Sequence, residues 1–527
     1  MRYLLWFIFF ILNIINMAFS SKHALHMFQQ NRYELPRYFG WLKQRKFGYD
    51  ELVSMIGIIV LFLIPMFFMN YMIKIFWIVM IILIKVIIQY LVEKKKNYIK
   101  PLVFTARVKR QIVTLLIINA IFCGGFWCLS VQWWPVAFIF STYSSWLLIV
   151  VVYYLNKPIE ILINNHYLNE AKKIINNMPY LKKIGITGSY GKTSTKNIIF
   201  SVLSDEYYTL QTPHSYNTPM GITITIRKYL KPIHEVFICE MGADKVNEID
   251  YLTKFVKPHF GIVTSIGPQH LNTFITLENI INEKMKMIEN LPSDGVGFIN
   301  MDNQYIRDYH IKNDCRLIKY GIKSRDVDYH VEDIEYSDKG STFVIVDKCD
   351  VRYHFSTCLL GEHNIMNILV AVAVAKELGI SWENLQSTIK DIQYVEHRLQ
   401  LKKINDYTFI DNAFNSNPEG AAMSLEVLSR MSNKRFIITP GMIDLGEKQD
   451  EANREFGRQM LNKVDHVILV GKNQTISIVE GLKDVGFDQT KINVVDTVKQ
   501  AFDLVYSIAT VNDTILLEND LPDAFNR

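Results

Sequence analysis

The segment 184–196 carries residues whose types and spacing could bind the phosphates of a nucleotide. A β-prone lead-in precedes Gly188 and Gly191, and Lys192 and Thr193 then open an apolar-periodic stretch. This order predicts a strand, a tight loop and a helix. Backbone N–H groups turn inward in such a loop, and the helix N-terminus adds partial positive charge, so a phosphate chain fits there. Lys192 would reach the β- and γ-phosphates, and the Thr193 hydroxyl would bind Mg²⁺.

The loop departs from the strict Walker pattern, which has a glycine where this chain has Ile186. A glycine-rich turn before a helix is commonly structural, but the Gly-Lys-Thr ending favours a nucleotide site. The predicted nucleotide contacts are Gly188, Ser189, Gly191, Lys192, Thr193 and Ser194.

Three further residues downstream could contribute to chemistry. Glu240 ends an apolar strand, and a carboxylate there, beside a phosphate loop, is well placed to hold Mg²⁺. His270 lies just beyond the next predicted strand, and Lys284 lies in a predicted amphipathic helix. Taken alone, His270 is typical of a surface or capping histidine, and Lys284 of a solvated lysine.

Length and charge limit the classes of protein that fit. A chain of 527 residues should form several domains, and its six cysteines include no Cys-x-x-Cys pair that would indicate a zinc site. Residues 1–155 carry 16 Lys and Arg against 4 Asp and Glu, so residues 156–527 sum to −7. The excess of basic residues lies in an apolar region, so the net charge of the chain does not support a nucleic-acid partner.

Five apolar stretches predict an α-helical transmembrane region over residues 1–155. Each approaches the length that crosses a hydrocarbon core of about 30 Å. The first is predicted to be a span because no small-residue cleavage site is convincing before Ser20, although a cleaved segment is the alternative. The predicted spans are 3–19, 51–69, 72–92, 111–129 and 133–155.

The loops between these spans predict the orientation. Basic residues concentrate between spans one and two and between spans three and four, whereas the other two connections carry no charge. By the positive-inside rule the N-terminus is outside and the rest of the chain is cytoplasmic, where ATP is available. We therefore expect a multi-pass protein of the cell membrane with its catalytic domains in the cytoplasm.

The remaining sequence predicts an α/β fold with a largely parallel sheet. A tether over 156–180 joins the membrane region to a central domain over 181–396 and a C-terminal domain over 397–527. Strands are predicted at 182–187, 234–240, 259–265, 295–300, 407–411, 434–439, 465–470 and 513–518, with a β-rich patch at 328–357 and a helix at 364–378.

The order of these signatures resembles the Mur ligases, which join amino acids to carboxylates using ATP. The similar stretches are 187–195, 217–221, 240–243, 270–271, 300–303, 361–367, 396–399, 411–418 and 441–447. Among family members, the ligase that adds D-alanyl-D-alanine to a UDP-muramyl tripeptide is the most similar. The resemblance implies a P-loop central domain and a Rossmann-like C-terminal domain.

The resemblance also implies roles for individual residues. Thr193, Glu240 and His270 would hold one Mg²⁺, and a carbamylated Lys284 would help to bind a second. His363, Asn364 and Asn367 would lie on the adenine side, with Arg398 and Asp411 contacting the nucleotide from the hinge. Asn217, Thr218, Asn415 and Asn417 would contact the substrate, and Lys192, His270, Lys284 and Arg398 would serve catalysis.

The implied activity is an ATP-dependent carboxylate–amine ligase of peptidoglycan precursor synthesis. The γ-phosphoryl group of ATP would pass to the acceptor carboxylate, and the amine of an amino acid or dipeptide would displace phosphate from the acyl phosphate. Lys192 and the two magnesium ions would neutralise developing charge. Alternatives are a membrane-associated ligase for another acid, such as a polyglutamate synthase, and a non-catalytic nucleotide-binding sensor or transporter.

Three departures from the family bear on the substrate. Asn412 stands where the family has a second hinge aspartate, and 518–523 replaces a glycine- and basic-rich turn. This chain has no room for the family's N-terminal domain, which binds the UDP-sugar, because only about 25 residues separate the last predicted span from the phosphate loop. We therefore expect a lipid-linked or membrane-delivered acceptor, with a soluble UDP-linked muramyl peptide as the rival.

Overall fold

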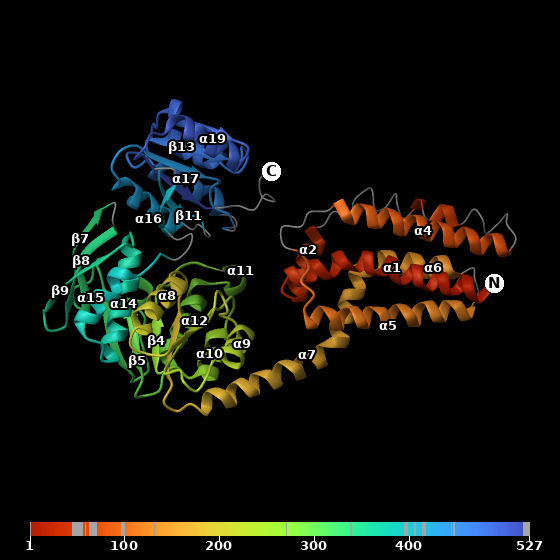
Figure 1. Cartoon of the computed structure of the whole chain (residues 1–527), viewed down its shortest axis with the longest axis horizontal. Helices are drawn as coiled ribbons and strands as arrows, with labels where there is room; N and C mark the ends of the chain where they lie inside the picture. Colours follow the sequence, from red (N-terminus) through yellow and green to blue (C-terminus); the bar gives the residue numbers. More distant parts are fainter. Residues whose placement is uncertain are drawn as a thin grey trace. The chain divides into compact units, whose positions relative to one another are not determined.

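A computed structural model describes most of the chain, which divides into two compact units, residues 1–166 and 167–527 (Figure 1). The described residues are 2–44, 56–57, 59–62, 71–95, 101–129, 133–269, 271–337, 340–394, 399–404, 407–413, 418–443, 445 and 448–519.

The described part of the N-terminal unit consists of helices and the short segments that connect them. Three of its helices are long and apolar enough to cross a membrane, over Phe7–Gln30, Ile73–Lys94 and Ser145–Asn176. The predicted spans 3–19 and 72–92 overlap the first two of these. The helices are α1 (Arg2–Gln30), α2 (Leu35–Gln44), α4 (Tyr71–Lys95), α5 (Ala106–Leu129), α6 (Trp134–Tyr143) and α7 (Ser145–Asn176).

None of the other three predicted spans coincides with a single candidate helix of the described residues. The span 51–69 falls mostly outside the described residues, and 111–129 lies within α5, which is not among the three candidates. The predicted span 133–155 is not one helix, because α6 ends at Tyr143 and α7 starts at Ser145. At the break between them, the Ser144 hydroxyl donates to the carbonyl of Phe140. From there α7 continues through most of the predicted tether 156–180.

Buried polar pairs join the helices of this unit. Asn16 donates to the Thr142 hydroxyl at 2.8 Å, and Arg110 on α5 makes a two-bond pair with Glu160 on α7 at 2.8 and 2.9 Å. Such pairs satisfy polar groups that would otherwise be buried among apolar side chains, and so they favour one arrangement of the helices.

The second unit contains a nine-stranded sheet in the order β2-β3-β1-β4-β5-β6-β7-β8-β9. Neighbours from β2 to β7 are parallel, and β7, β8 and β9 form an antiparallel extension. The strands are β1 (Lys182–Thr187), β2 (Thr209–Gln211), β3 (Val236–Glu240), β4 (Phe260–Val263), β5 (Val296–Asn300), β6 (Arg316–Gly321), β7 (Tyr329–Ser337), β8 (Gly340–Asp347) and β9 (Arg352–Thr357).

Helices cover both faces of this sheet because its strands alternate apolar side chains between two cores. In β3, Ile238 faces one core and its neighbours Phe237 and Cys239 face the other. The first core is closed by α8 (Lys192–Ser204), α14 (Glu362–Glu377) and α15 (Trp382–Asp391). The second is closed by α9 (Pro219–Tyr229), α10 (Glu248–Val256), α12 (Leu277–Glu289) and the last turns of α7. Two short helices, α11 (Leu271–Phe274) and α13 (Gln304–Arg307), precede α12 and follow β5, respectively.

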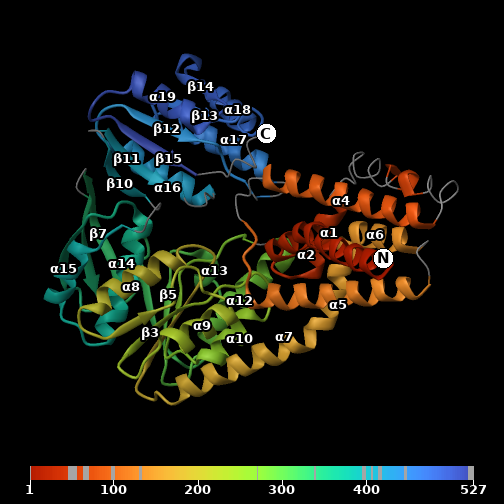
Figure 2. The same cartoon turned by 45° about the vertical axis from the view of Figure 1, so that its right-hand side comes forward.

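A second sheet of six strands, in the order β10-β11-β15-β12-β13-β14, forms the C-terminal part (Figure 2). Only β10 is antiparallel to its neighbour. Its elements are β10 (Gln400–Ile404), β11 (Tyr407–Asn412), α16 (Pro418–Ser429), β12 (Arg435–Thr439), α17 (Gln449–Gln459), β13 (His466–Val470), α18 (Ile476–Asp484), β14 (Ile492–Val495), α19 (Val498–Ile508) and β15 (Thr514–Glu518).

The predicted α/β organisation is confirmed, and every predicted strand corresponds to an observed one. The observed β2, β6, β10 and β14 were not predicted. β2 has three residues, and β2, β10 and β14 lie at the edges of their sheets. The nucleotide-binding signature itself has its predicted form, with β1 ending at Thr187 and α8 starting at Lys192.

Glu283 on α12 fixes the start of α10. Its buried carboxylate accepts hydrogen bonds from the backbone N–H groups of Asn247 at 2.8 Å and Ile249 at 2.6 Å. Since bonds to an ionised acceptor at a helix N-terminus are among the stronger ones, Glu283→Ala should destabilise the protein by about 3 kcal/mol. Thermal melting of the purified full chain would measure this, with Glu278→Ala, an exposed carboxylate on the same helix, as the control. Equal melting temperatures for the two variants would contradict the role of Glu283.

Candidate active site

The phosphate loop joins β1 to α8 and is fixed by the segment after β4. Gly188 has φ +151°, and a Cβ there would meet the Thr264 hydroxyl at 2.1 Å, so a side chain does not fit. The backbone N–H of Ser189 donates to the carbonyl of Ser265 at 2.7 Å. Its hydroxyl donates to the carbonyl of Gly267 and accepts from the Gly267 N–H, both at 3.0 Å. The loop is therefore held in shape by the neighbouring strand end.

Lys192 and Gly191 mark the start of α8. Gly191 is the N-cap residue, with φ +81°. The Lys192 ammonium donates to the loop carbonyls of Gly188 at 2.7 Å and Ser189 at 3.0 Å. The lysine thus lies over the concave side of the loop, where its charge would meet the phosphates.

Glu240, at the end of β3, is the centre of a buried polar cluster. Its carboxylate is 2 % exposed and accepts hydrogen bonds from the Thr193 hydroxyl at 3.2 Å and the Asn217 amide at 3.0 Å, both on Oε1. Its second oxygen, Oε2, has no hydrogen-bond partner in the described part of the chain, although the Lys196 ammonium lies 3.4 Å away as an ion pair. A carboxylate oxygen and a hydroxyl side by side are the ligands that Mg²⁺ prefers, so these residues fit a magnesium ion.

Lys196 is a residue of this cluster that the sequence prediction missed. It is 1 % exposed and donates to the carbonyls of Thr212 at 2.9 Å and His214 at 2.8 Å, besides its ion pair with Glu240. It lies on the same face of α8 as the buried Ile199 and Leu203, and a lysine at apolar spacing is the signal that could have found it. Lys196 connects the Glu240 carboxylate to the loop that precedes Asn217 and Thr218.

Lys284 is buried, so its interpretation as a solvated lysine is wrong. The side chain is 2 % exposed, its ammonium donates to the carbonyl of Ala243 at 3.2 Å, and it lies 5.8 Å from the centre of the Phe274 ring. Burial and the nearby positive charge of Lys192 lower the pKa of Lys284 to about 7. The neutral amine, which is the form that reacts with CO₂, is therefore far more populated near pH 7 than in an exposed lysine.

Asn217 and Thr218 are placed by the start of α9. The Thr218 hydroxyl is the N-cap and accepts from the N–H of Gly221 at 3.3 Å. Asn217 turns toward Glu240 instead, so of the two only Asn217 joins the cluster around the predicted metal site.

On the predicted adenine side, α14 packs against α8. Asn367 accepts from the Thr195 hydroxyl at 2.8 Å, and its buried amide nitrogen has no partner among the described residues. Asn364 donates to the carbonyl of Leu360 at 2.9 Å, which holds the first turn of α14. His363 lies at the same helix start, next to Gly361.

The hinge residues are described only in part. Asp411 is buried on β11 and forms an ion pair with Lys402 at 2.6 Å, while its other oxygen accepts from the N–H of Ala413. Asn412 donates to the carboxylate of Glu518 on β15 at 2.8 Å. Four predicted site residues lie outside the described residues, namely His270, Arg398, Asn415 and Asn417.

Comparison with known proteins identifies two family domains along the chain. The Mur ligase middle domain matches residues 186–375, and the domain described as "Mur ligase, glutamate ligase domain" matches residues 397–518. Together these matches cover more than half of the chain.

Similar proteins include ligases of one kind. The UDP-N-acetylmuramoyl-tripeptide–D-alanyl-D-alanine ligase of Bacillus subtilis is 26 % identical over 339 residues, which are 64 % of this chain and 72 % of that protein. The enzyme of the same name from Haemophilus influenzae is 27 % identical, over 56 % of this chain and 65 % of its own length.

Solved structures show the same fold. A crystal structure of MurF from Acinetobacter baumannii has a TM-score of 0.60 at 24 % identity, covering 68 % of this chain and 77 % of its own. The MurF ligase from Thermotoga maritima in complex with ADP has a TM-score of 0.61 at 22 % identity, covering 68 % and 80 %. With its nucleotide loop, its buried carboxylate and two matched domains in family order, the chain belongs to the Mur ligase family.

Proposed function

We propose that this Mur ligase uses ATP to join D-alanyl-D-alanine to the free carboxylate of a muramyl tripeptide in peptidoglycan precursor synthesis. The observation that carries the catalytic part is the convergence of Thr193, Glu240 and Lys284 around the phosphate loop. The names of the similar ligases support the choice of substrates. A sensor that only binds nucleotide would not need a second, buried lysine of lowered pKa beside Lys192.

The reaction proceeds in two displacements. An oxygen of the acceptor carboxylate attacks the γ-phosphorus of ATP, and ADP leaves with the electrons of the broken P–O bond. The amine of the dipeptide then attacks the acyl carbon, loses a proton, and orthophosphate leaves as the peptide bond forms. Lys192 would stabilise the charge that develops on the transferred phosphoryl group, because its ammonium already lies over the loop.

The metal requirement follows from the same residues. Bound Mg²⁺ would supply charge neutralisation at the phosphoryl oxygens. Thr193 and Glu240 would hold one ion, with His270 as a further predicted ligand. Carbamylated Lys284 would help to hold the second ion, and the pKa of about 7 provides the neutral amine that carbamylation needs.

Substrate and nucleotide contacts complete the proposal. Asn217 would face the acceptor from the metal site, with Thr218, Asn415 and Asn417 as further predicted contacts. His363, Asn364, Asn367 and Asp411 would bind the nucleotide, and Arg398 would act as the C-terminal domain closes and excludes water from the acyl phosphate.

Lys192→Ala should abolish ATP-dependent ligation and leave membrane insertion intact, since the lost charge acts on the transferred phosphoryl group. Release of orthophosphate from ATP in the presence of both substrates would measure this. Lys182→Ala, which removes an exposed lysine from β1, is the matched control. Activity of Lys192→Ala close to that of the control would remove Lys192 from the catalytic residues.

Lys284→Ala should be inactive and partly rescued by added short-chain carboxylates, which can replace the carbamate oxygens. Activity of the unmodified protein should rise between about pH 6 and pH 8 and depend on bicarbonate, because the neutral amine fraction of Lys284 grows through its pKa of about 7. Lys286→Ala, on the same helix, should keep its activity. Full turnover of Lys284→Ala without added carboxylate would disprove the carbamate.

The apolar N-terminal unit supports association with the cell membrane, with the ligase domains in the cytoplasm. Single cysteines placed at 97, 130 and 165 in a cysteine-free background would report the orientation. Position 130 should react with an impermeant reagent in intact cells, and 97 and 165 only after the membrane is opened. Labelling of 165 from outside would separate the nucleotide site from cytoplasmic ATP.

The acceptor is proposed to be lipid-linked or delivered by a membrane partner. The match to the Mur ligase middle domain begins at residue 186, and before it three helices of the described residues are apolar enough to span a membrane, whereas one span already anchors a protein. A ligase attached to the membrane also meets a lipid-linked acceptor at raised effective concentration.

The purified full chain in detergent, given ATP and D-alanyl-D-alanine, should turn over a lipid-linked muramyl tripeptide faster than the UDP-linked form. L-Glutamate in place of the dipeptide tests the alternative of a polyglutamate synthase and should not support turnover. A higher rate with the soluble UDP-linked acceptor would refute the lipid-linked acceptor while keeping the ligase assignment.

A further inference from the structure

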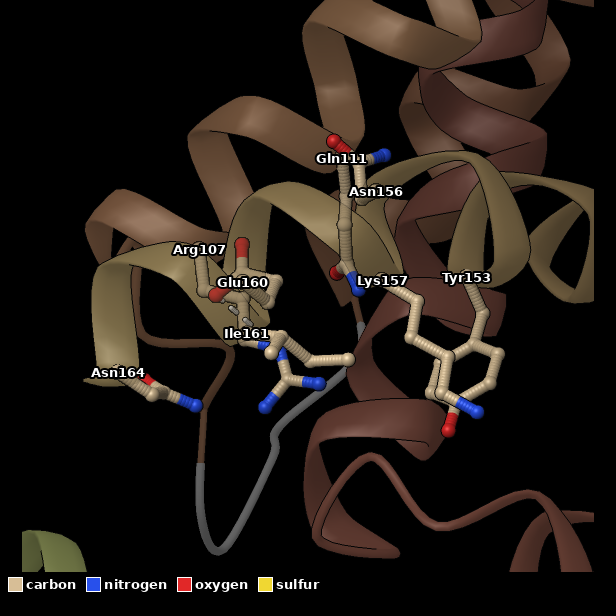
Figure 3. A pocket seen from close by; sticks show the side chains of 8 residues that line it. All are labelled: Arg107, Gln111, Tyr153, Asn156, Lys157, Glu160, Ile161 and Asn164. Carbon is tan, nitrogen blue, oxygen red and sulfur yellow. Dashed lines mark ion pairs between the residues drawn. The ribbon is translucent and has the colours of Figure 1, made fainter. Parts of the chain in front are cut away.

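A cavity of about 150 Å³ lies between α5 and α7 in the N-terminal unit (Figure 3). Gln111, Asn156 and Glu160 form its buried part, and Lys157 and Ile161 form an exposed rim. At about 30 Å³ for each water of the liquid, the space exceeds what one ordered water needs. The cavity can therefore admit a polar group of several atoms.

The charges that line this cavity are mostly positive. Glu160 is compensated by the two hydrogen bonds from Arg110, at 2.8 and 2.9 Å. Arg107 lies farther away, 4.0 Å from the same carboxylate, and its guanidinium stacks over the Tyr33 ring. With Glu160 occupied by Arg110, Arg107 and Lys157 leave an excess of positive charge at the cavity, which favours an anion.

Gln111 supplies a second, independent indication of a ligand. Its side chain is 2 % exposed, and its carbonyl oxygen has no hydrogen-bond partner among the described residues. Asn156 on the same cavity wall is satisfied, since its amide donates to the Thr114 hydroxyl and the carbonyl of Val152, both at 2.9 Å. A buried carbonyl oxygen left without a donor is costly, and reversing the Gln111 amide, which exchanges its oxygen and its N–H groups, would present donors to an anion.

The apolar surface beside the rim points to a lipid as the source of that anion. Leu155, Ile159, Ile161 and Leu162 are exposed on α7 next to the polar lining residues. An acyl or prenyl chain could lie along these side chains while its headgroup enters the cavity. Basic pockets between membrane helices on the cytoplasmic side are suited to anionic headgroups, and the predicted orientation places the start of α5 on that side.

We propose that this cavity binds the phosphate headgroup of a lipid in the cytoplasmic leaflet, through Arg107, Lys157 and Gln111. The site lies wholly within the N-terminal unit, and the proposal does not depend on the identity of the ligated substrates.

Titration calorimetry of the purified full chain in dodecylmaltoside tests the site. The probes are dioctanoyl phosphatidic acid, dioctanoylglycerol, which lacks the phosphate, and inorganic phosphate, which lacks the chains. We expect saturable binding of phosphatidic acid, and binding of the other two at least about tenfold weaker. Arg107→Gln and Gln111→Leu should each weaken binding of phosphatidic acid by about tenfold.

Two further variants keep the test decisive. Lys109→Gln removes an exposed charge from the same turn of α5 without touching the cavity, and it should bind as the unmodified chain does. If Arg107→Gln fails to fold, Arg107→Lys is used instead. This variant keeps the positive charge and should retain most of the affinity for phosphatidic acid. Equal binding of dioctanoylglycerol, equal binding of inorganic phosphate, or an equal loss in Lys109→Gln would each overturn the proposal.

Discussion

The burial of the Glu240 carboxylate is the constraint on which the rest of the site depends. An ionised carboxylate removed from water is costly unless charges and hydrogen bonds compensate it. Thr193 and Lys196 from α8 and Asn217 from the loop before α9 provide that compensation. Two segments distant in sequence, α8 and the loop before α9, are thereby tied to one side chain at the end of β3. The start of α8 and the loop before α9 are consequently held to the end of β3.

Lys196 extends this constraint into the backbone. Its ammonium binds two carbonyls of the segment that leads to Asn217 as well as the Glu240 carboxylate. Breaking a buried ion pair by removing one partner leaves an uncompensated charge, so neither Lys196 nor Glu240 can be lost alone without disturbing the other. The role of Lys196 is therefore to position its neighbours, because its ammonium is already bound by groups of the protein itself.

The two lysines at the other side of the site create a different electrostatic problem. Burial lowers the pKa of Lys284, and the repulsion from Lys192 lowers it further, so Lys284 gives up its proton more easily than an exposed lysine does. An anionic ligand near Lys192 relieves the repulsion. Conversion of Lys284 to a carbamate would also relieve it, by turning a destabilised cation into an anion that binds metal.

Local sequence patterns determined much of this protein, and long-range contacts decided the remainder. The phosphate loop between β1 and α8, Glu240 at a strand end, and the alternation of strands and helices were all predictable, because glycine spacing and apolar periodicity act over a few residues. The burial of Lys284 and the role of Lys196 depend on partners far away in the chain, and the capture of Asp411 by Lys402 depends on the pairing of β10 with β11. The break between α6 and α7 was not predicted, and neither were the edge strands β2, β10 and β14. A side chain's charge state and partners are properties of its surroundings, and only the folded chain brings those surroundings together.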